Sequence, residues 1–301
     1  MPVFLPAHTL SLKKIKEYMD SYSFKPKKKL GQNFLTDNNI IALMVQALNL
    51  DKEESVFEIG TGFGSLTIAL IPYVRHIFSV ENDTRFKPIL NEILAPYDDS
   101  ITVLYQDILT FDLAYFLQQK KQEGYHIEKL VGNLPYSISL PLLRKIMDLH
   151  GNIKTAVLMV QKEVAERMLA KPGSKNYGLL SVLSSYYAQI EKIHLVKPNV
   201  FFPKPIVDSL ILKIQFLSEP SIEVADEALF FKVMGAIFQY RRKRIDNALL
   251  LYFGESLSKE SLADIFLMTG IDPGERGDNL PLTELSHLTA ALKGLLPETP
   301  S

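Results

Sequence analysis

The feature that most limits the fold of this chain is a glycine-rich turn between a strand pattern and a helix pattern. Residues 55–59 (SVFEI) are a short, mostly apolar run that predicts a buried strand. Gly60-Thr61-Gly62-Phe63-Gly64 follows, and residues 65–71 predict a helix. Glycines in such a turn let the backbone approach a ligand and adopt positive φ. This order opens a nucleotide-binding βαβ unit, so we expect an α/β fold built on a doubly wound sheet.

The spacing of the glycines narrows the class of ligand. The turn has the pattern G-x-G-x-G, and Ser65 follows it, so the G-x-G-x-x-G fingerprint of dinucleotide binders is absent. A smaller adenosyl ligand fits this turn better than a dinucleotide. The turn alone is weak evidence, since glycine-rich turns also occur without a ligand.

Polar residues stand at the ends of the next predicted strands. Residues 76–80 end in Glu81, residues 101–105 in Gln106-Asp107, and residues 129–132 in Asn133. Glu81 follows Gly60 by 21 residues (81 − 60), close to the offset of about 20 at which an acid binds ribose hydroxyls. An acid such as Asp107 can accept a hydrogen bond from an adenine amine. Each alone is also explained as an exposed strand-end residue, but together they indicate one pocket at the carboxyl edge of the sheet.

Asn133-Leu134-Pro135-Tyr136 carries the most specific chemistry of these strand ends. The Asn amide and a backbone carbonyl offer two hydrogen-bond acceptors, Pro stiffens the turn, and Tyr adds an aromatic face. This set suits a planar ring with an exocyclic amine, such as adenine. The alternative is a strand-end turn with its Tyr packed on the core.

Composition excludes several classes of protein. The chain has no Cys, and its six His show no metal-ligand spacing, so we expect no metal site. No apolar run approaches the roughly 18 residues of a membrane span, and residues 1–10 do not resemble a signal peptide, so a cytoplasmic protein is expected. Net charge is −1, so any nucleic acid must bind local clusters such as Lys25 with Lys27–Lys29, or Arg241–Arg244.

Three parts are predicted along the chain. Residues 1–24 form an extension with one helix at about 11–22, residues 25–217 an α/β domain, and residues 218–301 a helical domain. Strands near 155–160, 190–196 and 207–216 complete the sheet. The Phe201-Phe202-Pro203-Lys204-Pro205 segment either closes over a base or packs its aromatic rings in the core.

An ordered series of motifs resembles one family, the ribosomal RNA adenine N6,N6-dimethyltransferases. Members of this family use S-adenosylmethionine to dimethylate two adjacent adenosines in a hairpin near the 3′ end of small-subunit rRNA. The resemblance runs from about Lys27 to Leu285 and rests on the following blocks: Leu30-Gly31-Gln32-Asn33-Phe34-Leu35, Glu58–Gly64, Glu81, Asp107, Asn133–Tyr136, Gln161–Val164, Tyr177–Val182, Phe201–Pro205, Val207–Ser209 and Arg241–Lys243.

The resemblance implies a Rossmann-like methyltransferase sheet of seven strands with a small all-α C-terminal domain. It also implies roles for individual residues. Catalysis would fall to Asn133, Leu134, Pro135 and Tyr136. The cofactor would be bound by Gln32, Asn33, Leu35, Gly60, Gly62, Glu81, Asp107 and Asn133. The target base or RNA would be contacted by Tyr136, Phe201, Arg241, Arg242 and Lys243.

The chain departs from the family pattern in two places. Ile206 stands where the family usually has Lys, and Glu81-Asn82-Asp83 differs from the usual flanks of its acid. The expected partner is small-subunit rRNA or its pre-ribosomal particle, bound by a monomer. Two alternatives stay open: an enzyme that methylates an amine in large-subunit rRNA or DNA, and a non-catalytic RNA-binding assembly factor on the same fold.

Overall fold

The computed structural model describes residues 10–296, which divide into two compact units. The first contains the described residues up to Ala165 together with Gln189–Ser218. The second contains Glu166–Ala188 and the described residues from Glu219 onward. The chain therefore crosses between the units three times, and the last crossing falls between Ser218 and Glu219.

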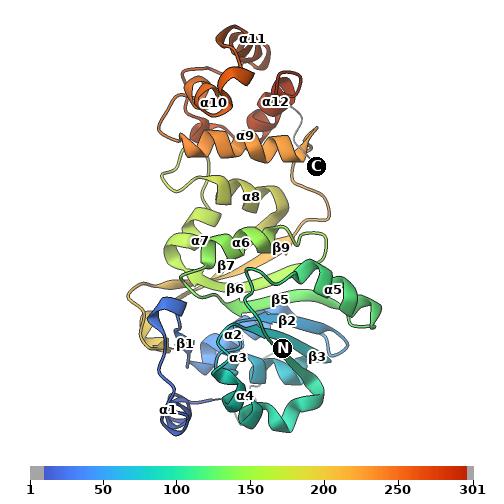
Figure 1. The fold of residues 1–301 in the computed structure, drawn as a ribbon, viewed down its shortest axis with the longest axis vertical. Coiled ribbons are helices and arrows are strands. Elements are labelled where there is room, and N and C mark those ends of the chain that lie inside the picture. The colour runs from blue at the N-terminus through green and yellow to red at the C-terminus, as the bar shows by residue number, and fades with distance from the viewer. Residues whose placement is uncertain (1–9, 297–301) are drawn as a thin grey trace. The chain divides into compact units, whose positions relative to one another are not determined.

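The first unit is built on a seven-stranded sheet with the order β4-β3-β2-β5-β6-β9-β7 (Figure 1). Strands β2, β3, β4, β5 and β6 are parallel to one another, and β9 runs antiparallel to β6. This confirms the predicted seven-stranded α/β fold. The chain builds outward from β2 through β3 and β4, then returns to build the other side from β5, which makes β2/β5 the switch point where such sheets bind ligands. The strands are β2 (Ser55–Ile59), β3 (His76–Glu81), β4 (Ile101–Tyr105), β5 (Ile127–Asn133), β6 (Thr155–Gln161), β7 (Ala188–Val196) and β9 (Ser209–Phe216).

Helices cover both faces of this sheet. One face packs Val56, Ile77 and Val131 against apolar residues of α2 (Asn38–Leu48) and α3 (Ser65–Leu70). Asp37 begins α2 by accepting hydrogen bonds from the backbone N–H groups of Asn39 and Ile40, at 2.8 and 3.2 Å. On the other face, Phe57 and Phe78 pack edge-to-face against Phe116 of α5 (Leu113–Gln122). The remaining helices of this region are α4 (Phe86–Leu94), α6 (Ser139–Met147) and α7 (Lys162–Met168).

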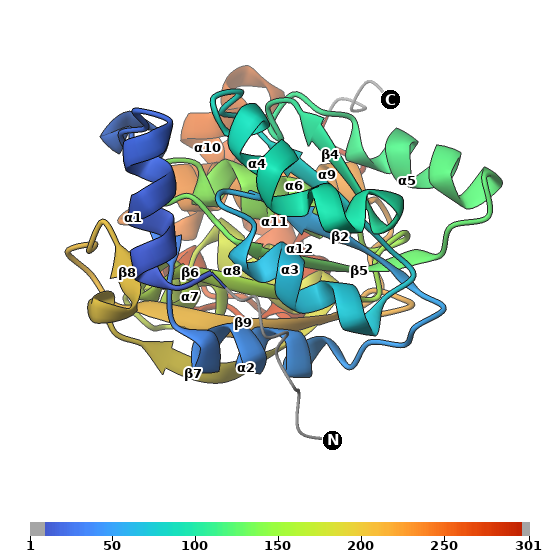
Figure 2. The same ribbon diagram turned by 90° about the horizontal axis from the view of Figure 1, so that it is seen from below.

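The N-terminal segment is tied to the first unit by aromatic packing. Helix α1 (Leu12–Ser21) begins at its N-cap Ser11, in agreement with the predicted helix, and buries Ile15 and Met19. After it, the Phe24 ring lies 4.5 to 6.3 Å, centroid to centroid, from the rings of Phe34, Phe63 and Phe86. Strand β1 (Phe34–Leu35) then pairs antiparallel with β8 (Phe201–Phe202), and α1 lies beside β8 (Figure 2).

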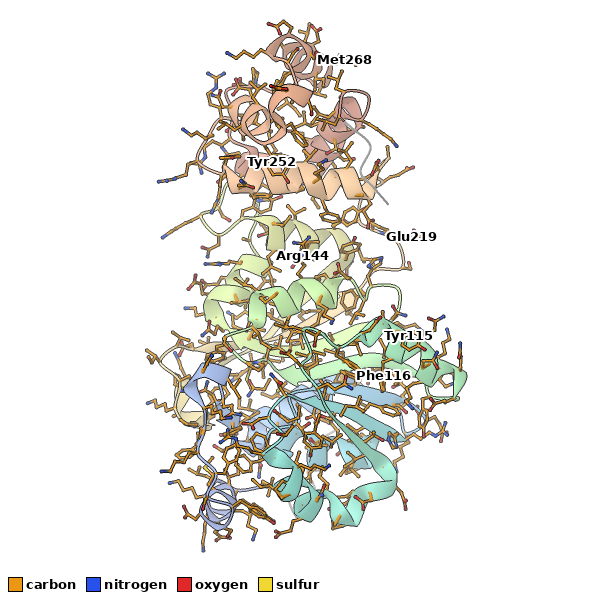
Figure 3. The ribbon with its side chains drawn as sticks, in the orientation of Figure 1. Tyr115, Phe116, Arg144, Glu219, Tyr252 and Met268 are labelled. Atoms are coloured by element: carbon orange, nitrogen blue, oxygen red, sulfur yellow. The ribbon has the colours of Figure 1, made fainter. Side chains whose placement is uncertain are left out.

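The second unit is helical within its described residues. Its core joins Tyr186 of α8 (Leu179–Tyr187) to Phe230 of α9 (Glu227–Gln239), with ring centroids 5.5 Å apart. It continues through α10 (Ile245–Phe253), α11 (Lys259–Thr269) and α12 (Leu282–Leu292). Figure 3 labels Tyr252 of α10 and Met268 of α11, which are 38% and 79% exposed. The predicted helical character of the C-terminal region is confirmed.

Short 3₁₀ turns connect several of these elements, at Lys28–Leu30, Ile71–Tyr73, Ala95–Ser100, Pro198–Val200, Gly254–Ser256 and Gly277–Asn279. Within residues 10–296, no helix combines the length and the apolar character that a membrane span requires.

Candidate functional site

A pocket of about 400 Å³ lies at the carboxyl edge of the sheet, around the β2/β5 switch point. This volume is within the range of small-molecule sites, roughly 300–1,000 Å³. All four predicted strand ends contribute to the pocket. Its lining consists of residues 29–34, Ile59, Gly60, Gly62, residues 80–82, Phe86, residues 106–108 and residues 133–138.

The glycine turn and Glu81 form one side of the pocket. Gly62 adopts a φ of +54°, and its N–H donates to Glu81 Oε2 at 2.9 Å. The other carboxylate oxygen, Oε1, accepts from the Asp83 N–H at 2.8 Å. Burial raises the pKa of the Glu81 carboxyl, and the backbone donors oppose that shift. The carboxylate is thus held in a fixed position against the turn, with lone pairs left over for ligand hydroxyls.

The N-terminal strap, which we define as residues 25–35, forms the opposite side. Asn133 Nδ2 donates to the Asn33 carbonyl at 3.0 Å, and Asn33 Nδ2 donates to the Gly31 carbonyl, also at 3.0 Å. Gly31 has a φ of +64°, and a Cβ there would lie 3.1 Å from both Ser137 Oγ and the Tyr136 backbone nitrogen. Only glycine therefore lets the strap pass this close to the Asn133–Tyr136 turn.

The Asn133–Tyr136 turn is itself fixed by the strands around it. The Leu134 N–H donates to the Met159 carbonyl at 3.0 Å, and the Leu134 side chain is buried. The Tyr136 hydroxyl lies 2.6 Å from Ser209 Oγ at the start of β9. Burial raises the pKa of Tyr136, so its phenol stays neutral at physiological pH. The turn thus presents an amide, a backbone carbonyl and a half-buried aromatic ring in one place.

The Glu58 carboxyl is buried beneath the glycine turn. Its role was not predicted, because Glu58 lies within a mostly apolar strand pattern. Its Oε2 accepts hydrogen bonds from Thr67 Oγ1 and Ser79 Oγ, both at 2.7 Å. Its Oε1 is buried without a hydrogen-bond partner among the described residues. Burial raises the pKa of Glu58 to about 7, against the two hydroxyl donors. The one sequence signal for such a site was a charged residue within a strand pattern that is otherwise mostly apolar.

Two predicted site residues lie in the core and do not line the pocket. Leu35 and Phe201 are partners in the β1/β8 pair, are 6% and 4% exposed, and belong to the cluster packed by α2. The placement of Phe201 corrects the expectation that its ring closes over a base. In this two-residue strand, alternation directs Phe201 inward, while Phe202 is partly exposed and lies under the Lys16 ammonium, 5.2 Å from its ring centroid.

The basic block lies in the second unit, in the turn between α9 and α10. Arg241 Nε donates to the buried Asp278 carboxylate at 2.9 Å, and Arg241 Nη2 donates to the Ser174 carbonyl at 3.0 Å. This guanidinium is bound within the chain, and its predicted contact with RNA stays a prediction. Arg242 and Lys243 are exposed.

Comparisons with known proteins agree with this arrangement. A model of the family described as "Ribosomal RNA adenine dimethylase" matches residues 23–282. The chain belongs to this family. The match includes every strand and the strap, as well as α9, α10 and α11 of the second unit.

Relatives with similar sequences match this chain over most of its length and most of their own. The chain is 40% identical over 281 residues to a ribosomal RNA small subunit methyltransferase A of Macrococcus caseolyticus, covering 92% of this chain and 94% of the relative. It is 38% identical to the protein of the same name in Clostridium botulinum, covering 93% and 99%. A methyltransferase family implies S-adenosylmethionine as the methyl donor.

Solved structures show the same fold. A dimethyladenosine transferase of Plasmodium falciparum superposes with a TM-score of 0.73 at 23% identity, covering 87% of this chain and 98% of the other. The 23S rRNA methyltransferase ErmE gives a TM-score of 0.62 at 24% identity, with coverages of 86% and 99%.

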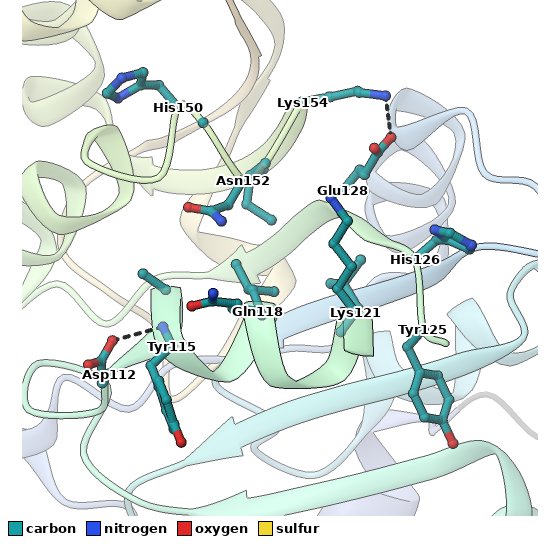
Figure 4. Close-up of a pocket in the computed structure, with 15 residues that line it drawn as sticks. Asp112, Tyr115, Gln118, Lys121, Tyr125, His126, Glu128, His150, Asn152 and Lys154 are labelled. Carbon is teal, nitrogen blue, oxygen red and sulfur yellow. Dashed lines mark hydrogen bonds and ion pairs between the residues drawn. The ribbon is translucent and has the colours of Figure 1, made fainter. Parts of the chain in front are cut away.

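A larger hollow of about 570 Å³ lies at the amino ends of β5 and β6 (Figure 4). Three of its acidic and basic side chains are engaged in local structure: Asp112 caps α5 through the Tyr115 N–H at 3.0 Å, and Lys154 pairs with Glu128 at 2.6 Å. Open α/β sheets place ligands at the opposite edge.

No group of three His, Cys, Asp or Glu residues with metal-binding geometry occurs in the described part of the chain.

Proposed function

We propose that this chain transfers methyl groups from S-adenosylmethionine to N6 of two adjacent adenosines in the 3′-terminal hairpin of small-subunit rRNA. The observation that carries the proposal is the convergence of Gly60, Glu81, Asp107 and Asn133 on one pocket under the N-terminal strap. The names of the relatives at 38–40% identity support the substrate.

The pocket suits an adenosyl cofactor. Glu81 is fixed by backbone N–H groups at the end of β3 and would accept the ribose hydroxyls. Asp107 at the end of β4 would accept the adenine amine, with Ile108 as an apolar wall beside it. Gly60 would face the amino-acid portion, and Gln32 and Asn33 would cover it from the strap. S-adenosylmethionine supplies an electrophilic methyl group on a sulfonium, so the protein need not activate the donor.

The remaining task is to make the adenine amine a nucleophile. Its lone pair is delocalised into the ring, and acceptors for its N–H bonds favour the pyramidal form in which the lone pair is localised. The bond from Asn133 Nδ2 to Asn33 orients the amide, which leaves Oδ1 to accept from the substrate. With the Leu134 carbonyl as a second acceptor, the amine would be positioned for in-line attack, an effect worth several kcal/mol and up to about 7–11 in ideal cases. Both acceptors also stabilise positive charge growing on nitrogen.

Tyr136 would hold the target base by stacking. Its hydroxyl is anchored to Ser209, so the ring is already oriented before RNA binds. A base must leave its stack to reach the pocket, which costs a few kcal/mol, and stacking on Tyr136 offsets part of that cost. For the second methylation, one N–H remains for an acceptor while the first methyl group is accommodated.

The test is incubation with radiolabelled S-adenosylmethionine and small ribosomal subunits that lack the modification, followed by nucleoside analysis. We expect label in N6,N6-dimethyladenosine of the 3′ hairpin. Label in large-subunit rRNA would favour the alternative enzyme on this fold. Cofactor binding without any label on subunits at several stages of assembly would favour a non-catalytic assembly factor.

A further inference from the structure

The acidic segment after β3 contains a second carboxylate that the proposed chemistry does not use. Asp83 is 5% exposed, although it follows Glu81 by only two residues and lies in a surface connection between β3 and α4. A carboxylate is rarely buried this fully unless its oxygens are bound. Its partners come from the N-terminal strap and from Arg85.

One partner is the strap residue Gln32, which also lines the cofactor pocket. Gln32 Nε2 donates to Asp83 Oδ2 at 2.9 Å, and Gln32 Oε1 accepts from the Lys27 N–H at 2.8 Å. Both ends of this amide are therefore used. One end closes a loop within the strap, and the other ties that loop to the end of β3.

The other partner is Arg85, which reaches the start of the strap. Its Nε donates to Asp83 Oδ1 at 2.8 Å, and its Nη1 donates to the Lys25 carbonyl at 3.1 Å. The guanidinium also lies over the Phe24 ring, 4.5 Å from the centroid. Asp83 and Arg85 thus hold the strap at Lys25 and Gln32, and Arg85 also contacts Phe24 just before it.

The same residue reaches the predicted ribose site. The Asp83 N–H donates to Glu81 Oε1 at 2.8 Å, so the strap, Asp83 and Glu81 form one connected hydrogen-bonded network. Burial by itself would raise the pKa of Asp83. Hydrogen bonds from Arg85 and Gln32 outweigh this effect and lower the pKa from its ordinary value of 3.8 to about 2. The carboxylate is therefore charged at physiological pH, and its hydrogen bonds to the strap are charge-assisted.

We propose that Asp83, oriented by Arg85, is a positioning residue that latches the N-terminal strap over the cofactor pocket and so controls the rate of cofactor exchange. This inference rests on the proposed function for the identity of the cofactor. The strap forms one side of the pocket, and on this proposal it moves when cofactor enters or leaves. The Gln32–Asp83 bond is one of the links between strap and sheet that this movement breaks.

The first experiment measures dissociation of S-adenosylmethionine from the full-length protein in the absence of RNA. Losing a hydrogen bond to a charged group typically changes an equilibrium by about 10-fold or more, so Asp83→Asn should speed dissociation by about that factor. Arg85→Gln, which keeps the Gln32–Asp83 bond, should have a smaller effect in the same direction. An unchanged dissociation rate in both variants would overturn the latch.

The second unit offers a matched control. Asp278 is also buried, at 4% exposure, and is also paired with arginines, Arg241 and Arg276. Asp278→Asn removes a comparable carboxylate that does not line the pocket. It should lower thermal stability without changing the cofactor dissociation rate. An equal acceleration in this control would reduce the Asp83 effect to general destabilisation.

A second readout needs no cofactor. Lys27, Lys28 and Lys29 place trypsin sites within the strap. In Asp83→Asn, tryptic cleavage there should be about 10-fold faster than in the unmutated protein, while Asp278→Asn should not change it. Equal cleavage rates would contradict the latch. If the unmutated protein does not bind S-adenosylmethionine, the proposed function fails, and the cleavage rates still decide whether the latch exists.

Discussion

The Glu58 carboxyl links the protonation of a single residue to the stability of the glycine turn. Its folded pKa of about 7 lies above the ordinary value of 4.5, so the folded protein binds this proton more tightly than the unfolded chain. The resulting stabilisation is complete below about pH 4.5, declines between 4.5 and 7, and is lost above 7. The neighbouring Ser79 hydroxyl lies 2.6 Å from Thr61 in the turn itself, so the effect is local to the cofactor pocket.

We predict that Glu58→Gln removes this pH dependence, because glutamine is uncharged at every pH. The stability difference between variant and unmutated protein should shift in favour of the variant by about 3 kcal/mol from pH 4.5 to above pH 7. Urea unfolding at pH 5 and pH 8 measures this shift. The exposed residue Glu53, changed to Gln, serves as control. An equal pH response in both variants would rule out Glu58 as its origin.

Phe201 shows at the residue scale how a motif can be recognised while one of its roles is misassigned. Since its ring is 4% exposed in the core, Phe201→Ala should cost about 3–5 kcal/mol of unfolding free energy. Chemical denaturation gives this value directly. A stable Phe201→Ala protein with impaired RNA methylation would instead restore the base-contact role.

At the scale of elements, the seven strands of the main sheet could be predicted because local patterns specify them. Residues 55–59 and 101–105 are strands with the predicted bounds. Contacts between distant segments could not be predicted in this way. The strap meets Asn133 across 100 residues, and Arg241 meets Asp278 across 37. No local pattern indicates that these residues are partners.

The approach of the strap to the Asn133–Tyr136 turn gives a prediction for this element. In Gly31→Ala, the new methyl group would lie 3.1 Å from two atoms of the turn, and alanine would adopt an unfavourable positive φ. We expect cofactor affinity to fall about 5- to 30-fold, corresponding to about 1–2 kcal/mol of backbone strain. Calorimetric titration measures it. Gly151→Ala, with no atom within 4 Å of the added carbon, is the control. Unchanged affinity in Gly31→Ala would show that the strap does not need this close approach.

At the scale of the whole molecule, charge is balanced overall and concentrated locally. A net charge of −1 gives no general attraction to RNA, so we propose that binding depends on exposed clusters such as Arg242 and Lys243. The predicted three-part division of the chain stays a proposal. It placed residues 166–188 in the α/β domain, whereas in the structure they belong to the helical unit. Sequence order alone does not show this assignment, because α8 is followed by two more strands of the sheet.

We predict that Arg242→Ala/Lys243→Ala weakens RNA binding and lowers the slope of log affinity against log salt by about 2, or about 1 for each phosphate contact. Filter binding to small-subunit RNA at several salt concentrations gives the slope. Arg241→Ala should mainly reduce stability, because its guanidinium neutralises Asp278. A slope unaffected by the double variant would place the RNA contacts elsewhere.

We propose that the Asn133–Tyr136 turn, held under the strap, positions the target amine for methyl transfer. Its most direct test is single-turnover methylation of unmodified small subunits by the unmutated protein and by Asn133→Ala, both at saturating S-adenosylmethionine. By analogy with the loss of one transition-state hydrogen bond, the methylation rate of the variant should fall about 100- to 1,000-fold. A near-normal single-turnover rate in Asn133→Ala would contradict the account.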